Sequence, residues 1–178
     1  MKFSLFDNSN TQEVIQLFTD VFSTSEGEEE GNSIGELVAN LIDWTPADDI
    51  IGFVALEEGG LIGSILFTRL IVPDAREAFI LSPVAIATGV QGRGIGQKLI
   101  RFGIDHLKSQ QVNFVFTYGN PDFYAKTGFR QVDAKVIKAP YPLSQPIGWL
   151  AQSLDGTPMQ ELSGSTQCVA AFSNPVYW

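Results

Sequence analysis

The sequence of 178 residues is long enough for one globular domain with a substantial core, and its composition, 44% apolar and 17% charged, is that of a folded chain. The net charge of −9 argues against nucleic-acid binding through phosphates, and the single cysteine, Cys168, excludes an internal disulfide and an all-cysteine metal site. No apolar stretch is long enough to span a bilayer and the N-terminus lacks the apolar run of a signal peptide, so we expect a cytoplasmic protein.

The first sixty residues predict two helices and the beginning of a sheet. Apolar residues at helical spacing predict a helix over 11–22, with Thr11 as its N-cap. The glutamate-rich segment 25–31 is predicted to be a charged loop, and a short second helix is expected over 34–42. Strands are predicted over 50–56 and 61–72, joined by a hairpin turn at 57–60.

The middle of the chain predicts a strand, a long helix, a second strand and a short helix. The first strand, over 77–87, contains Pro83, which cannot donate to a ladder, so we expect a bulge or a splay there. The long helix is expected from about Gly92 to Gln110. A buried strand follows over 113–118, and then a short helix over 121–127 that has proline near its start and ends at Gly128.

The last part of the chain predicts more strands. They are expected over 129–138, 147–154 and 166–172, with a proline-rich link over 140–146. No internal repeat or domain boundary is evident. We therefore expect a single domain over 1–178, with residues 139–178 as C-terminal strands that complete the sheet.

The charges are divided unevenly along the chain. Residues 1–60 hold 13 acids and one base, a net charge of −12, whereas residues 61–178 hold seven acids and ten bases, a net charge of +3. Four bases, against Asp105 alone, lie in one glycine-rich segment and the helix after it: Arg93, Lys98, Arg101 and Lys108. This arrangement predicts a polyanionic ligand at that segment.

The glycine-rich segment Gln91–Gly96 reads QGRGIG and lies between a predicted strand and a predicted helix. Its glycines let a ligand approach the backbone closely, and the helix N-terminus adds the positive end of its dipole. Two other phosphate-binding motifs fail. A dinucleotide motif needs glycine where Gln97 or Leu99 stands, and a P-loop needs lysine where Ile95 stands.

A second segment, Asn120–Phe129, reads NPDFYAKTGF. With Gln91–Gly96, it resembles the GNAT superfamily of acetyl-CoA-dependent N-acetyltransferases, in a bacterial subgroup of uncertain acceptor. The resemblance covers roughly residues 1–135, with both motifs in the family's order and on the expected elements. It implies the α+β (mixed α/β) GNAT fold, in which a central, mixed and splayed β-sheet carries helices on both faces.

The resemblance also implies a reaction, direct transfer of acetyl from acetyl-CoA to a primary amine of a small molecule or peptide, without a metal. In the family, the amides that match Gly92–Gln97 hold the pyrophosphate of CoA, and the splayed strand pairs with its pantetheine arm. The implied cofactor-binding residues are Val84, Ala85, Ile86, Gln91, Gly92, Arg93, Gly94, Ile95, Gly96, Gln97 and Asn120. Arg93 and Lys98 either contact phosphate or are solvated, and Asn120 either bonds the pantetheine or caps the next helix.

Tyr124 matches the family's tyrosine that protonates the departing CoA thiolate, which a phenol with a pKa of about 10 can do. The alternative is a tyrosine packed on the turn at Gly128. No general base stands out. The candidates are a water held near Ser82 and five carboxylates: Glu26, Glu28, Glu29, Glu30 and Glu36. His106 and Cys168 are expected to be structural.

The acceptor is the least defined part of the prediction. In the family, the first two helices and their link wall the acceptor site, so the acidic first part of this chain favours a cationic amine, unless it is only a solvated surface. The expected partners are acetyl-CoA and this amine, with neither nucleic acid nor a membrane. The terminal strand and the exposed aromatics are compatible with a homodimer.

Two alternative functions remain. The first is an acyl-CoA-binding sensor or partner-binding module without useful catalysis, suggested by the missing base and the aromatic tail, residues 172–178. The second is an enzyme that uses CoA thioesters for a reaction other than N-acylation.

Overall fold

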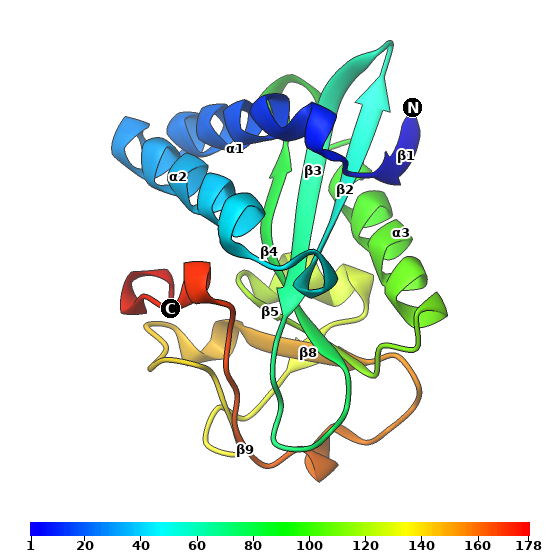
Figure 1. Cartoon of the computed structure of the whole chain (residues 1–178), viewed down its shortest axis with the longest axis vertical. Coiled ribbons are helices and arrows are strands. Elements are labelled where there is room, and N and C mark those ends of the chain that lie inside the picture. The colour runs from blue at the N-terminus through cyan, green and yellow to red at the C-terminus, as the bar shows by residue number, and fades with distance from the viewer. The chain divides into compact units, whose positions relative to one another are not determined.

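The computed structural model describes all residues, 1–178 (Figure 1). The chain divides into two compact units. The first unit consists of Met1–Leu66 and Pro83–Gly103, and the second of Phe67–Ser82 and Ile104–Trp178. Strands β3 (Gly60–Arg69) and β4 (Ala78–Ile86) and helix α3 (Ile95–Ser109) contribute residues to both units. None of the helices is long and apolar enough to cross a membrane.

The strands of the first unit follow the hydrogen-bonded order β1-β2-β3-β4. β1 (Lys2–Leu5) pairs antiparallel with β2 (Ile50–Glu57), with Lys2 opposite Leu56. β2 is followed by β3 through Glu58 and Gly59 alone, whose φ values are +52° and +81°. Two residues with positive φ are typical of the tightest hairpins, so the predicted turn is confirmed.

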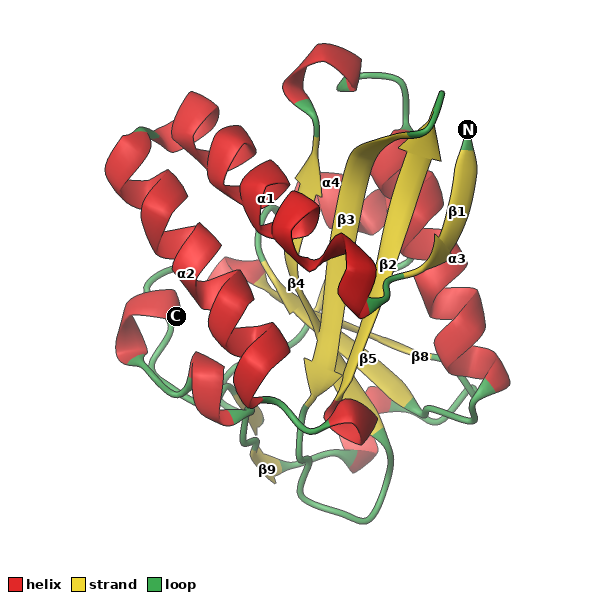
Figure 2. Cartoon of the chain, turned by 45° about the horizontal axis from the view of Figure 1, so that its top comes forward, coloured by secondary structure: helices red, strands yellow, loops and turns green.

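Helices cover both faces of these strands. Helices α1 (Thr11–Glu26) and α2 (Glu28–Trp44) lie side by side; α1 crosses in front of β3, and α3 lies behind β2 (Figure 2). On the α3 side, the Phe102 ring centroid lies 5.7 Å from those of Phe3 and Phe53. Successive strand residues face opposite sides, so Val54, which is also buried, faces away from α3.

The acidic segment 25–31 is helical, so the predicted loop is wrong. α1 continues to Glu26, α2 begins at Glu28, and only Gly27, with φ +102°, separates them. The first turn of α2 carries three glutamates, which the positive end of its dipole stabilises. Gly31 is buried against α1, because a Cβ there would lie 1.8 Å from Ser23 Oγ.

The strands of the second unit follow the order β3-β4-β5-β8-β6, which completes a mixed set of seven strands. β5 (Phe114–Tyr118) runs parallel to β4, whereas β8 (Trp149–Ser153) runs antiparallel to both β5 and β6 (Arg130–Gln131). Strands β7 (Ile137–Lys138) and β9 (Gly164–Ser165) form a separate pair. The mixed sheet with helices confirms the predicted fold class.

The short helix after β5 lies where the sequence predicts it. α4 (Pro121–Tyr124) is continued by a 3-10 turn over Ala125–Thr127 and ends at Gly128, which has φ +99°. A left-handed glycine is a common helix terminator, because it bears no Cβ.

Other predictions need correction. Residues 129–138 contain only the short strands β6 and β7, because Asp133 holds a turn between them by accepting from Lys135 N at 2.8 Å. Residues 166–172 are not a strand, since a single bridge joins Gln167 to Ile71 and a 3-10 turn follows over 170–172. Thr11 is the first residue of α1 rather than its cap.

Candidate active site

The glycine turn at the end of β4 is fixed by two hydrogen bonds in the first unit. Gln91 Nε2 donates to Ile86 O at 2.9 Å, and Ala87 N donates to Ile62 O of β3 at 2.9 Å. Gly63 of β3 leaves room for the strand end, because a Cβ there would lie 2.6 Å from Ile86 Cδ1. The turn is therefore held to the sheet at its beginning.

Two glycines give the turn its path. Gly92 and Gly94 have φ values of +78° and +73°, which side-chain-bearing residues rarely adopt. Nothing lies within 4 Å of the position that a Cβ would take at either residue. α3 therefore begins at Ile95 and not at Gly92 as predicted, and the backbone before it is open to a ligand.

The backbone N–H groups of residues 92–97 find no acceptor in the chain. The first amide of this region that bonds is Lys98 N, which donates to Gly94 O at 3.1 Å. Six successive donors at a helix N-terminus form a site for an anion. The turn therefore combines unpaired backbone donors with open space beside Gly92 and Gly94.

The predicted cofactor-binding residues of this region lie together in the first unit, at 84–86 and 91–97. Ile95 is buried, so its side chain is not available to a ligand. Arg93 forms an ion pair with Glu57, Nη1 to Oε2 at 3.4 Å, and its side chain is 58% exposed. The Arg93 guanidinium is therefore solvated and already has a carboxylate partner.

Pairing between β4 and β5 ends just before Pro83, where the sequence predicts an interruption. The last rung joins Leu81 to Thr117, and β4 continues for five residues beyond it. Thr117 is fully buried, and its hydroxyl donates to Leu81 O at 2.8 Å. This side-chain bond reinforces the last rung.

Tyr124 lies over the backbone of Gly119 in the second unit. A Cβ on Gly119 would lie 2.7 Å from Tyr124 Cε2, so the ring needs glycine at this position. Phe123 and Phe129 contact the ring edge-to-face, with centroids 5.0 and 5.7 Å from its own. The Tyr124 ring therefore packs on Phe129, directly after the turn at Gly128.

The surroundings of Tyr124 favour the protonated form of its phenol. Burial raises the pKa of Tyr124, and a hydrogen bond with Thr117 offsets part of that effect. A protonated phenol is the form that can give a proton to a thiolate. The sequence does not reveal that Thr117 affects the pKa of Tyr124, because in the sequence Thr117 is only one residue of an apolar strand.

Asn120 and Cys168 have structural roles in the chain. Asn120 Oδ1 accepts from Asp122 N at 2.8 Å and so caps α4, which confirms one of the two predicted roles. Cys168 is half-buried, its Sγ lies 3.7 Å from Ser173 Oγ, and burial raises the pKa of its thiol. A protonated thiol is a poor nucleophile.

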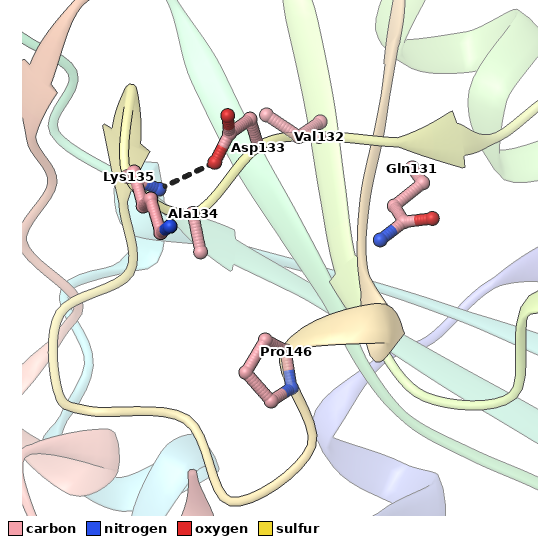
Figure 3. Close-up of a pocket in the computed structure, with 6 residues that line it drawn as sticks. All are labelled: Gln131, Val132, Asp133, Ala134, Lys135 and Pro146. Carbon is pink, nitrogen blue, oxygen red and sulfur yellow. Dashed lines mark hydrogen bonds between the residues drawn. The ribbon is translucent and has the colours of Figure 1, made fainter.

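A surface pocket of about 530 Å³ lies elsewhere in the second unit. Its walls are residues 131–135 and Pro146, and Ala134 and Pro146 point into it (Figure 3). None of the predicted site residues lines this pocket. It therefore does not contribute to the candidate active site.

Comparisons with known proteins identify the family. Residues 48–131 match the family described as Acetyltransferase (GNAT) domain. The uncharacterized N-acetyltransferase YjhQ of Escherichia coli K12 is 33% identical over 172 residues, which cover 93% of this chain and 91% of YjhQ. The chain belongs to the GNAT acetyltransferase family.

Solved GNAT structures share the fold. YhbS from Escherichia coli, in complex with CoA, superposes with a TM-score of 0.84 at 19% identity, over 97% of this chain and 92% of YhbS. A GNAT acetyltransferase from Brucella melitensis, in complex with acetyl-CoA, superposes with a TM-score of 0.76 at 23% sequence identity, over 97% of each chain. Membership of the GNAT acetyltransferase family confirms the predicted acyltransferase.

Proposed function

We propose that this GNAT enzyme transfers the acetyl group of acetyl-CoA directly to a primary amine on a cationic small molecule or peptide. The observation that carries the donor half is the row of free amides over residues 92–97. The pyrophosphate would accept from these amides, and each charge-assisted bond contributes about 1.5–3 kcal/mol. The backbone of 84–86, which lies beyond the last rung with β5, would pair with the pantetheine arm.

Tyr124 is the proposed proton donor. As the amine nitrogen bonds to the acetyl carbon, the C–S bond breaks, and Tyr124 gives its phenol proton to the leaving sulfur. The amine loses its own proton to solvent, and the phenolate regains one from solvent. The raised pKa of Tyr124 supports this role, because the phenol stays protonated through the neutral range.

The helix junction at Gly27 supports a cationic acceptor. Four exposed carboxylates lie within five residues at this junction: Glu26, Glu28, Glu29 and Glu30. A single residue lies between the two helices, so the four charges share one short stretch of surface. Such a surface concentrates cations and steers them toward it.

The test of the reaction is turnover of acetyl-CoA, followed by thiol release, against diamines, aminoglycosides, amino acids and peptides. Tyr124→Phe should lower kcat by about 10²–10⁴-fold, the range of general acid catalysis, while the Kd for CoA is unchanged. Wild-type turnover by Tyr124→Phe would remove the phenol from the mechanism. Lack of turnover with every amine would reject the proposed acceptor class.

A charge-neutral variant tests the acceptor class. Replacement of Glu28, Glu29 and Glu30 by Gln should raise KM for a dicationic amine and leave KM for a monoamine nearly unchanged. Glu13→Gln, an exposed acid in the first turn of α1, is the matched control. Equal KM values for the dication in both variants would contradict recognition of a cation at this junction.

A further inference from the structure

Trp178 holds the ring of Tyr118, at the end of β5. The two rings stack with centroids 6.3 Å apart and planes 15° from parallel. Trp178 is only 6% exposed, and its Nε1 donates to Phe172 O at 3.1 Å, so the indole is itself fixed in place. Its position in turn restricts the position of the Tyr118 ring.

The Tyr118 hydroxyl holds a segment that we call the strap, residues 144–148. Ser144 Oγ lies 2.9 Å from this hydroxyl, and Gln145 N donates to it at 2.8 Å. The strap begins in the proline-rich link, over 140–146, and has no strand partner of its own before β8 begins at Trp149. One phenol therefore ties the strap to β5.

The strap reaches the backbone beneath Tyr124. Gly119 N donates to Gly148 O at 3.0 Å, and a Cβ on Gly148 would lie 2.9 Å from Gly119 O. On its other side, Gly119 contacts the Tyr124 ring so closely that a Cβ would lie 2.7 Å from Cε2. The strap, Gly119 and the Tyr124 ring are thus packed in series without spare room.

We propose that Tyr118 and Trp178 are positioning residues, which hold the strap and Gly119 so that the Tyr124 ring keeps its place. The consequence for catalysis rests on the proposed role of Tyr124 as proton donor. These contacts form a continuous series within the second unit, from Trp178 through Tyr118, the strap and Gly119 to the Tyr124 ring. We call this series of contacts the relay. The Tyr118 hydroxyl is the informative link, because Tyr118→Phe removes both of its hydrogen bonds and leaves the stacked ring.

The test reads the environment of Tyr124 directly. The full chain is labelled with 3-fluorotyrosine, whose phenol ionises at lower pH than tyrosine, and the four tyrosines are followed by ¹⁹F NMR. The signal that is missing from the spectrum of Tyr124→Phe belongs to Tyr124. In Tyr118→Phe and Trp178→Ala the Tyr124 signal should move and its pKa should fall, because the displaced ring gains contact with water. Trp178→Phe, which keeps an aromatic ring, should restore wild-type values.

Leu162→Ala provides the matched control for lost stability. Leu162 is 1% exposed and belongs to the same unit, and no contact of the relay involves it. This variant should be destabilised without a change in the Tyr124 signal.

In Tyr118→Phe and Trp178→Ala, kcat should fall by about tenfold with an unchanged KM for acetyl-CoA, because a small misplacement of a reacting group lowers the rate.

The possible results distinguish the positioning of Tyr124 by the relay from the role of Tyr124 as proton donor. An unchanged Tyr124 signal and pKa in both Tyr118→Phe and Trp178→Ala overturns the inference, as does an equal shift in Leu162→Ala. A moved signal with wild-type kcat in all variants, Tyr124→Phe included, supports the relay and instead rejects Tyr124 as the proton donor.

Discussion

Gly94→Ala is the sharpest perturbation of the proposed pyrophosphate site. Gly94 has φ +73°, and a residue with a Cβ pays about 1–2 kcal/mol to stay in that conformation. The backbone can relieve this strain by moving to negative φ, which would turn neighbouring amides away from the ligand. Loss of one charge-assisted hydrogen bond costs about 2 kcal/mol, so CoA should bind roughly thirtyfold more weakly.

Isothermal titration calorimetry with CoA measures this loss, with pantetheine as a second ligand that lacks the pyrophosphate. Gly94→Ala should weaken the binding of CoA and leave that of pantetheine unchanged. Gly89→Ala is the matched control, because Gly89 lies in the same loop, has no positive φ and has nothing within 4 Å of the position that a Cβ would take. If Gly94→Ala is folded and binds CoA as tightly as Gly89→Ala, the turn does not hold the pyrophosphate by its backbone.

Three further changes test other parts of the structure. Thr117→Val removes a hydrogen bond that lowers the pKa of Tyr124, so ¹⁹F titration should show a higher pKa, and a lower one would contradict this coupling. Hydrogen bonds from Thr157 and Asn113 hold the pKa of Asp155 well below its usual range. Asp155→Asn should therefore lower the urea midpoint at neutral pH, with a difference from wild type that shrinks as pH falls below about 4, where the unfolded-state carboxyl is protonated. Gly31→Ala should cost about 1–3 kcal/mol of unfolding free energy through overpacking against α1, and an unchanged melting temperature would show that the helices can separate freely.

The local parts of the fold and site follow from the sequence. Pro121 and Gly128 mark the ends of one short helical segment by their own backbone preferences. The strand, the glycine turn and α3 are likewise adjacent in the chain, so a short motif is enough to predict them. The predicted start of α3 is too early because the φ values of Gly92 and Gly94 depend on the turn as a whole.

Contacts between distant residues cannot be predicted in the same way. The importance of Thr117 depends on the register of β5 against β4, which sets Leu81 opposite it. The helical state of residues 25–31 depends on packing of Gly31 against Ser23, which composition alone does not reveal. The aromatic tail suggests an exposed surface for partners when it is seen as sequence, yet Trp178 is buried against Tyr118.

The ion pair between Arg93 and Glu57 would make anion binding by Arg93 at the proposed pyrophosphate site an exchange of partners. The guanidinium would leave the Glu57 carboxylate on β2 when it donates to a phosphate, so the net free energy gained would be the difference between its interactions with the two anions. An exposed pair of this kind is worth only about 0–1 kcal/mol, and the doubly charged diphosphate is the stronger competitor. Since salt screens the old pair as well as the new one, CoA affinity should fall less steeply with ionic strength than a free arginine would dictate. The release of Glu57 would also couple occupancy of the turn to the β2–β3 hairpin.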